Sequence, residues 1–450
     1  MPRLAWFTPL PPVPSGIAAY SAELLPHLAG RYEIDVFVDE HDSPGTSHGP
    51  SVYPAHDFVW KHFLRPYDLT VYQLGNAMCH DYMWPHLARY PGMVVLHDAQ
   101  LHHSRARVLL SRGRLDDYRE EVRYNHPDAP SNLAEIVIRG HGGTIYYGWP
   151  MLGTVMRTSR LVAVHSSRLA ANLAEEFPET PLQAIQMGVA DPVSSVSAAE
   201  IRSRHRIPQG SFVFAAYGGV TPEKRIPAVL RSLASVVRAA PDARLVLVGT
   251  TVDYYDVAAD IRASGLGDHV IVAGFVPDRE LPAYLQAADA CLCLRWPTGR
   301  ETSASWLRCL AAGRPTIITD LTHVDDVATL DPRSWTVLES CDESATDSNG
   351  GVQQPCAVSI DILDEVHSLT LAMRRLASDP ALCDTLGRAA RRRWEERHTL
   401  ERMAADYERA ITKALGLRSA RPADLPRHLQ PDGTGRARAL AAELGVALDF

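Results

Sequence analysis

Short apolar runs alternate with amphipathic helical segments along most of the chain, and this alternation limits the possible folds more than any other feature. In the first half the apolar runs occupy residues 3–9, 33–39, 68–75, 92–98 and 160–167. In the second half they occupy residues 211–219, 243–250, 269–275, 290–295, 316–320 and 335–340. Because parallel strands joined by helices give this pattern, the sequence predicts two doubly wound parallel α/β sheets.

A stretch rich in proline, serine and glycine, residues 187–210, separates the two halves and has little strand pattern. A chain of 450 residues exceeds what one hydrophobic core usually organises, so two domains facing a central cleft are expected. The predicted parts are an N-terminal domain (1–187), a C-terminal domain (188–395), a C-terminal helix packing back across the domains (396–416) and a tail without a functional interpretation (417–450).

Helical periodicity runs almost unbroken from residue 361 to residue 415, with Pro380 as an interruption and Gly416 as a stop signal. The polar stretch at 341–356 is typical of a surface loop. The C-terminal quarter is therefore expected to be a loop followed by long helices.

Composition excludes several classes of protein. Apolar residues make up 46% of the chain and charged residues 22%, which fits a soluble globular enzyme. The net charge of -8 disfavours a general nucleic-acid binder. The seven cysteines are scattered and lack metal-ligand spacing, so free thiols are expected. No apolar run is long enough for a signal peptide or a membrane span, which favours the cytoplasm and leaves contact with a membrane surface open.

The segment "RWPTGRETSASWLRCLAAGRPTIITD" (295–320) predicts a buried strand, a polar turn and a helix. Thr302 or Ser303 can cap the start of the helix, and Gly313 ends it. In such sheets the turn lies at the strand's carboxyl end, where helix N-termini attract anions. The turn therefore indicates an anionic ligand, although hydroxyl caps also begin ordinary helices.

A second glycine-bearing turn, "YGGVTPEKRI", follows the first strand of the second half. Gly218 and Gly219 allow a ligand to approach the backbone, and Lys224 and Arg225 could hold a diphosphate. A solvated helix start is the alternative. The spacing matches neither a Walker loop nor a dinucleotide fingerprint.

Six segments in fixed order resemble a known family. They are "PLPPVPSGIAAYSAELLPHLA", "LHDAQLHH", "AVHSS", "GGVTPEKRI", "VIVAGFV" and "RETSASWLRCLAAGRPTI". Together they are similar to the retaining nucleotide-sugar glycosyltransferases of family four, over about residues 1–415. The resemblance implies the GT-B fold, with two Rossmann-like domains, a nucleotide held by the C-terminal domain and no need for a metal.

In the N-terminal half, the resemblance places Gly16 against the donor phosphates and the acceptor. It makes His97 a catalytic residue near the donor sugar, oriented by Asp98 on the acceptor side. A packed histidine that ends a strand is the alternative for His97. His102 and His103 lack an acidic partner pattern, so no metal site is expected.

In the C-terminal half, the resemblance makes Lys224 the phosphate lysine, with Arg225 beside it. It implies that the backbone at Phe275 and Val276 meets the base.

The chain departs from the family's pattern at two places. Gly219 stands where the family has an arginine, and Arg225 is considered as its substitute. Arg308 stands where the family has the glutamate that meets the ribose. Glu301 lies one residue later than the family's other glutamate. Together with Thr302 and Ser303, it is expected to bind the sugar hydroxyls and phosphate of the donor.

The stretch "YQLGNAMCHDYMW" presents Asn76 and His80 after a predicted strand. Polar side chains there suit an acceptor rich in hydroxyls, but a capped helix would contain the same residues. A helix-rich insertion before "AVHSS" is expected to shape this pocket.

Together these features predict a hexosyltransferase-type enzyme that moves a sugar from a nucleotide-diphosphate sugar to an acceptor hydroxyl with retention. No cofactor beyond the donor substrate and no nucleic-acid partner are expected. Two alternatives remain: a non-catalytic nucleotide-sugar-binding protein or partner subunit, and a GT-B sugar-nucleotide epimerase.

Overall fold

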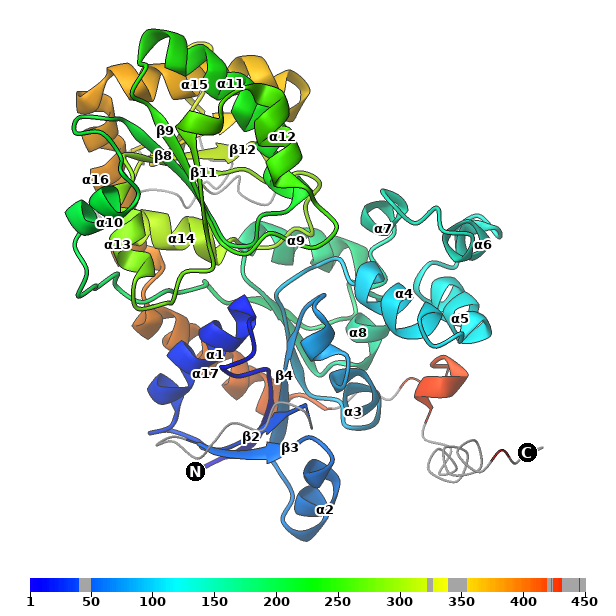
Figure 1. Ribbon diagram of the computed structural model, residues 1–450. Helices are drawn as coiled ribbons and strands as arrows, with labels where there is room; N and C mark the ends of the chain where they lie inside the picture. The colour runs from blue at the N-terminus through cyan, green and yellow to red at the C-terminus, as the bar shows by residue number, and fades with distance from the viewer. Residues whose placement is uncertain are drawn as a thin grey trace. The chain divides into compact units, whose positions relative to one another are not determined.

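The computed structural model describes residues 1–39, 50–321, 327–338, 354–418, 422, 424–430 and 445 (Figure 1). The chain divides into two compact units, each made from separate stretches of sequence. We call them the N-terminal unit (Met1–Val164, Leu173–Gln183 and Glu408–Phe450) and the C-terminal unit (His165–Asn172 and Ala184–Tyr407).

The first sheet has seven strands in the order β3-β2-β1-β4-β5-β6-β7. The strands are β1 (Arg3–Phe7), β2 (Glu33–Val38), β3 (Ser51–Pro54), β4 (Leu69–Leu74), β5 (Met93–Leu96), β6 (Leu161–Val164) and β7 (Leu182–Ala184). The pairs from β3 to β6 are all parallel. Helices cover both faces of such a sheet, which explains why the central strands are continuous apolar runs rather than alternating ones.

Helices connect the strands of the first sheet. They are α1 (Gly16–Leu28), α2 (Asp57–Leu64), α3 (Met83–Arg89), α4 (His102–Leu110), α5 (Leu115–Asn125), α6 (Leu133–Ile138), α7 (Ile145–Gly148), α8 (Gly153–Thr158) and α9 (Ser167–Glu176), with a short 3₁₀ helix, η1 (Met78–His80). Helices α4 to α8 form the helix-rich insertion between β5 and β6 that the sequence predicts, with a small hydrophobic core of their own.

The second sheet has eight strands in the order β10-β9-β8-β11-β12-β15-β13-β14. The strands are β8 (Val213–Tyr217), β9 (Arg244–Val248), β10 (Val270–Gly274), β11 (Ala290–Cys293), β12 (Thr316–Thr319), β13 (Thr329–Leu330), β14 (Val337–Leu338) and β15 (Ala357–Ile360). One prediction is wrong here. Of the expected strand at 335–340, residues 339 and 340 lie outside the described residues, and the described part contains the two exposed residues of β14, which run antiparallel to β13, so this sheet is not wholly parallel.

Helices cover both faces of the second sheet. They are α10 (Ala198–Arg204), α11 (Ile226–Ala239), α12 (Val257–Ser264), α13 (Leu281–Ala287), α14 (Ala304–Ala311), α15 (Glu365–Ser378) and α16 (Pro380–Arg397), with the 3₁₀ helices η2 (Pro222–Lys224), η3 (Gly267–His269) and η5 (Ile362–Asp364). Helix α17 (Leu400–Gly416) is different, because its residues from Glu408 onward belong to the N-terminal unit. Alternate residues of β8 enter two cores: Phe214 belongs to the core that includes α11 and α15, and Ala215 to the core that includes α10 and α13. Figure 1 shows these two pairs of helices on opposite sides of the sheet.

The predicted helical stretch at 361–415 is confirmed, with Pro380 opening α16 and Gly416 ending α17. The predicted polar loop at 341–356 lies outside the described residues, except for 354–356. Most of the tail also lies outside them, but a 3₁₀ helix, η6 (Arg427–Leu429), is described. The six described cysteines are free thiols, as predicted, and Cys341 is not among the described residues.

Candidate functional site

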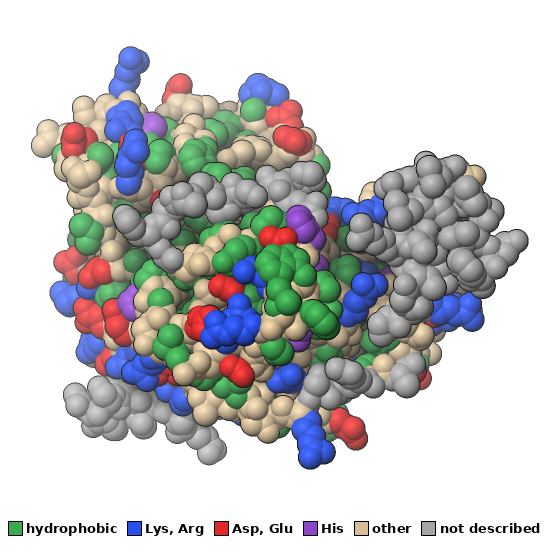
Figure 2. Space-filling model, turned by 90° about the horizontal axis from the view of Figure 1, so that it is seen from below, with side chains coloured by type: hydrophobic (Ala, Val, Ile, Leu, Met, Phe, Trp, Pro, Cys, Tyr) green, Lys and Arg blue, Asp and Glu red, His purple; other side chains and the backbone are tan. Residues whose placement is uncertain are grey.

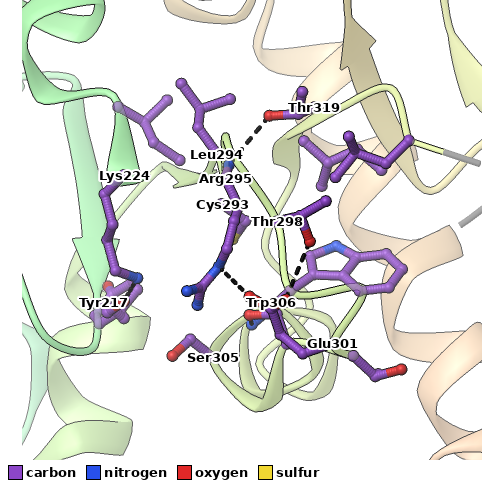
Figure 3. A pocket seen from close by; sticks show the side chains of 15 residues that line it. Tyr217, Lys224, Cys293, Leu294, Arg295, Thr298, Glu301, Ser305, Trp306 and Thr319 are labelled. Carbon is purple, nitrogen blue, oxygen red and sulfur yellow. Dashed lines mark hydrogen bonds and ion pairs between the residues drawn. The ribbon is translucent and has the colours of Figure 1, made fainter. Parts of the chain in front are cut away.

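A pocket in the C-terminal unit opens beyond the carboxyl ends of β8 and β11 (Figure 3). The order of strands in the sheet reverses between these two strands, and ligands of open α/β sheets bind at such a point. The pocket measures about 610 Å³, including the open space at its mouth. Four residues that the sequence singled out line it: Lys224, Glu301, Thr302 and Ser303.

Lys224, at the end of η2, donates a hydrogen bond from Nζ to the carbonyl oxygen of Tyr217. Burial lowers the pKa of the Lys224 ammonium to about 8, and the neighbouring Arg295 guanidinium acts in the same direction. The amine therefore carries a weakly solvated positive charge at neutral pH. An anion that enters the pocket can replace the lost water.

The turn before α14 is held by a chain of polar contacts around Glu301. Arg295 Nε lies 2.8 Å from Glu301 Oε1, and the Thr298 hydroxyl donates to Glu301 Oε2 at 3.0 Å. Thr298 Oγ1 also accepts the Arg300 N–H at 3.0 Å, and Arg300 adopts a left-handed φ of 57°. These contacts fix the turn in one shape before any ligand binds.

Arg295 is a pocket residue that the sequence analysis missed. It is separated from the end of β11 by Leu294 alone, and its backbone N–H donates to Thr319 Oγ1 at 3.1 Å. The available signal was a charged residue that ends a buried strand at the carboxyl edge of the sheet. About a third of its side chain is exposed, so the guanidinium reaches the surface of the pocket.

Helix α14 begins at the pocket, as predicted. Ser303 is its N-cap and accepts the Trp306 N–H at 3.3 Å, while the Thr302 hydroxyl donates to the carbonyl oxygen of His165 at 3.1 Å. The helix ends before Gly313, whose φ of 63° suits glycine. Its N-terminal end carries partial positive charge, which adds to that of Lys224.

Gly218 lies between the lysine and this helix. A Cβ atom added to Gly218 would lie 3.0 Å from Ser305 Oγ and 3.4 Å from Lys224 Nζ, and its φ is 84°. Gly249 supports Gly218 from the end of β9, because a Cβ there would lie 2.2 Å from the Gly218 carbonyl oxygen. Gly219 has room, with no atom nearer than 3.8 Å to an added Cβ.

The remaining predicted donor residues of this unit do not line the pocket. Arg225 has a left-handed φ of 60°, and its guanidinium binds both carboxylate oxygens of Glu365, at 2.6 and 2.7 Å. Phe275 follows β10 and is 70% exposed, whereas Val276 packs against the core around α13. Arg308 lies in the last turn of α14.

The predicted residues of the N-terminal unit meet at the carboxyl edge of its own sheet. Asn76 donates its backbone N–H to Asp98 Oδ2 at 2.8 Å, and His97 Nε2 lies 2.8 Å from Gln73 Oε1. Gly16 opens α1, with open space around an added Cβ.

His80 is more deeply buried than these residues. Its side chain is fully buried, Nδ1 lies 2.9 Å from the carbonyl oxygen of Gln73, and burial lowers the pKa of its imidazole to about 4. A neutral, enclosed ring of this kind packs like a core residue.

In the part of the chain that the structure describes, no helix is long and apolar enough to cross a bilayer. Helix α2 nevertheless exposes apolar side chains, among them Trp60 (50%), Phe63 (83%) and Leu64 (71%). Figure 2 shows hydrophobic side chains gathered near the middle of the face seen from below. Contact with a membrane surface stays a prediction.

Comparison with solved structures defines the class of fold. A sucrose-phosphate synthase from Thermosynechococcus elongatus superposes with a TM-score of 0.60 at 16% identity, covering 92% of this chain and 99% of that chain. A glycosyltransferase from Rickettsia africae gives 0.61 at 12% identity, covering 92% and 99%. Anabaena HepE in complex with UDP-glucose gives 0.58 at 15% identity, covering 91% and 99%. The chain has the GT-B fold of glycosyltransferases, with two Rossmann-like sheets.

The family comparison is more specific for one part of the chain. Residues 197–331 match the family described as Glycosyl transferases group 1, and this segment contains the whole pocket. No curated protein sequence matches the chain.

Proposed function

We propose that the protein transfers a sugar, as a hexosyltransferase, from a nucleotide-diphosphate sugar to an acceptor hydroxyl, with retention and without a metal. The observation that carries this proposal is the pocket where Lys224, Gly218 and the start of α14 meet. The group 1 segment and the complex of the structural neighbour HepE with UDP-glucose support the class of donor.

In this proposal the donor diphosphate lies over Gly218, where the absence of a side chain lets it approach the backbone. Lys224 Nζ and the first amides of α14 bind its oxygens. Arg295 supplies a second cation in place of the arginine that Gly219 replaces. Arg225 is left out of this role, because both carboxylate oxygens of Glu365 already bind its Nε and Nη2.

Catalysis then depends on charge and position. As the sugar–oxygen bond breaks, negative charge grows on the leaving diphosphate, and the fixed positive groups stabilise it. The leaving oxygen takes the acceptor proton on the same face of the sugar, which gives retention. Glu301 keeps Arg295 in place, and its turn positions the donor sugar.

The acceptor side is proposed at the polar edge of the N-terminal unit, where Gly16, Asn76, His97 and Asp98 lie. His97 is assigned to the donor sugar by the family resemblance alone. His80 is not assigned a role, because its ring is enclosed by the core.

A panel of nucleotides tests the proposed class. We expect one of UDP, GDP, ADP, CDP or dTDP, or its sugar, to raise the unfolding temperature equally in magnesium and in EDTA. A ligand at about 100 times its Kd adds about 2.7 kcal/mol to the free energy of unfolding. Product analysis with acceptors then separates transfer from the alternatives.

The outcomes of the panel are distinct. Stabilisation by a nucleotide without any turnover would favour the non-catalytic alternative, for which Arg308 at the ribose position is the motivating residue. A changed sugar nucleotide without an acceptor would indicate an epimerase. Stabilisation that requires magnesium would contradict metal independence, and no stabilisation at all would contradict the donor site.

The lowered pKa of Lys224 predicts a pH dependence of donor binding. Below about pH 8 the free protein carries the charged amine, and above it the amine loses its proton. The affinity for the sugar nucleotide should therefore be constant below pH 8 and fall by up to about tenfold per pH unit above it. Calorimetric titration between pH 7 and 9.5 measures this affinity. Lys224→Arg, which stays charged, should remove the fall, whereas a flat profile in the wild type would contradict the role of the amine.

A further inference from the structure

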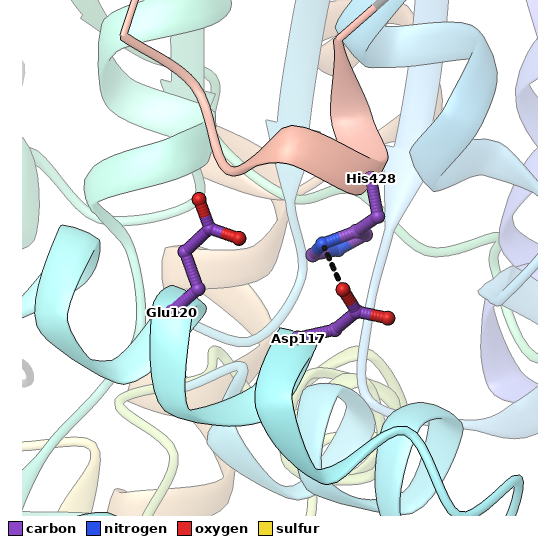
Figure 4. A group of neighbouring side chains, drawn as sticks. All are labelled: Asp117, Glu120 and His428. Carbon is purple, nitrogen blue, oxygen red and sulfur yellow. Dashed lines mark ion pairs between the residues drawn. The ribbon is translucent and has the colours of Figure 1, made fainter. Parts of the chain in front are cut away.

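A second cluster of polar side chains lies in the N-terminal unit, outside the group 1 segment (Figure 4). Asp117 and Glu120 stand three residues apart on α5 and share one face of the helix. His428 comes from η6, some 300 residues later in the chain. One ligand atom of each residue lies within 4.8 Å of the others, and His428 Nδ1 lies 3.5 Å from Asp117 Oδ1.

The two nitrogens of His428 have different surroundings. Nε2 lies 2.8 Å from Glu121 Oε1, and Glu121 is itself buried in an ion pair with Arg105. A carboxylate only accepts hydrogen bonds, so this contact places a proton on Nε2. Nδ1 is buried, has no hydrogen-bond partner and belongs to a side chain that is only 8% exposed.

A neutral imidazole in this tautomer directs the lone pair of Nδ1 toward the carboxylate of Asp117. Two electron-rich groups facing each other at 3.5 Å repel unless a metal cation lies between them or a second proton, on Nδ1, makes the ring an imidazolium. The distance is too long for a hydrogen bond, but it matches the separation of two ligands on one tetrahedral ion with bonds of about 2.0–2.2 Å. The nearby Arg114 occupies the other oxygen of Asp117, Oδ2, at 2.6 Å.

We propose that His428 Nδ1, Asp117 and Glu120 bind one divalent transition-metal ion of the zinc class. One imidazole and two carboxylates form a ligand set that zinc accepts, with water in the remaining position. Glu121 acts behind the ligands: by accepting the Nε2 proton it fixes the ring's orientation, as carboxylates often do for metal-bound histidines. Glu120 completes the site by a rotation of its side chain.

The ion would fasten the segment around η6 to α5. Without the ion this segment attaches through a small apolar contact of Leu425 and Leu429 with Ala88, through the contact of His428 Nε2 with Glu121, and through the Arg427 N–H that donates to Glu120 at 3.1 Å. So few contacts hold a terminal segment weakly, whereas metal bonds would hold it firmly. The proposed role of the ion is therefore structural.

The experiment uses the full-length protein after removal of metals with a chelator, titrated with Co²⁺ and with Zn²⁺. We expect one equivalent to bind, with the visible absorption of tetrahedral cobalt bound by nitrogen and oxygen. His428→Gln, Asp117→Asn and Glu120→Gln should each weaken binding by at least about tenfold. Asp116→Asn is the matched control: Asp116 is the neighbouring acid on α5, its side chain is 96% exposed, and binding should not change.

A second readout tests the position of the ion. Trypsin should cleave after Arg427 more slowly when Zn²⁺ is bound to the wild type, and Zn²⁺ should have no such effect in His428→Gln, with circular dichroism confirming that the variant is folded. Three results would overturn the proposal: no saturable binding, binding that all three variants retain, or a sulfur-to-cobalt charge-transfer band that assigns the ion to cysteine instead.

Discussion

Replacing Lys224 by alanine is expected to lower kcat/KM for sugar transfer by about 10²–10³-fold, the usual effect of removing one fixed group that stabilises transition-state charge. Its ammonium lies beside Gly218 in the pocket, where the proposed leaving diphosphate gathers negative charge. The free energy of unfolding should not fall, because burial disfavours the charged amine and lowers its pKa to about 8. Steady-state kinetics and urea unfolding measure the two effects.

Lys61→Ala is the matched control, because Lys61 Nζ lies in the N-terminal unit, 3.6 Å from the centroid of the Tyr53 ring. Transfer should be unchanged in this variant. Equal losses of activity and stability in Lys224→Ala would show that the lysine is structural. Unimpaired transfer would remove it from the site.

Replacing Gly249 by alanine is expected to damage both stability and donor binding. The new Cβ would lie 2.2 Å from the carbonyl oxygen of Gly218, and the φ of 146° is one that only glycine adopts easily. Backbone strain and overpacking together should lower the free energy of unfolding by about 2–5 kcal/mol. Relief of the clash moves Gly218 toward Lys224, so the affinity for the nucleotide should also fall.

Gly265→Ala is the control that separates the effect of backbone strain from the effect of a steric clash. Gly265 has a positive φ of 69°, but nothing lies within 4 Å of an added Cβ. The control should lose only about 1 kcal/mol and keep its affinity for the donor. Urea unfolding and nucleotide titration of both variants test this, and equal effects at the two glycines would contradict the proposed contact between Gly249 and Gly218.

The fold could be predicted because buried parallel strands leave a strong apolar signal. The central strands, such as β8 and β11, appear in the sequence as continuous apolar runs. The short edge strands carry no such signal: β3 contains a proline and is partly exposed, and β7 has three residues. The direction of β14 also could not be inferred, because two residues contain no information on pairing.

The site could be predicted in part. Ser303 and Lys224 could be predicted as site residues, because capping residues and glycine-bearing turns are local features of the sequence. The role of Arg225 could not be predicted, because it depends on a partner far away in the sequence. The role of Arg295 could not be predicted either, because the direction of its side chain depends on the three-dimensional shape of the turn. Glu365, 140 residues away, binds Arg225, whereas the turn at Glu301 brings Arg295 into the pocket.

The N-terminal unit contains both early and late stretches of the sequence, and this affects how it folds during synthesis. Glu408, in α17, pairs with Arg31 at 2.7 Å, and Lys413 donates to the carbonyl oxygen of Leu182 at 3.0 Å, while Ile411 is fully buried. The first sheet therefore lacks one of its covering helices until the ribosome has added almost the last residue of that helix. The N-terminal unit is therefore the first to be synthesised but the last to complete its fold. While the C-terminal unit is being synthesised, the uncovered apolar face of the first sheet must be protected from aggregation.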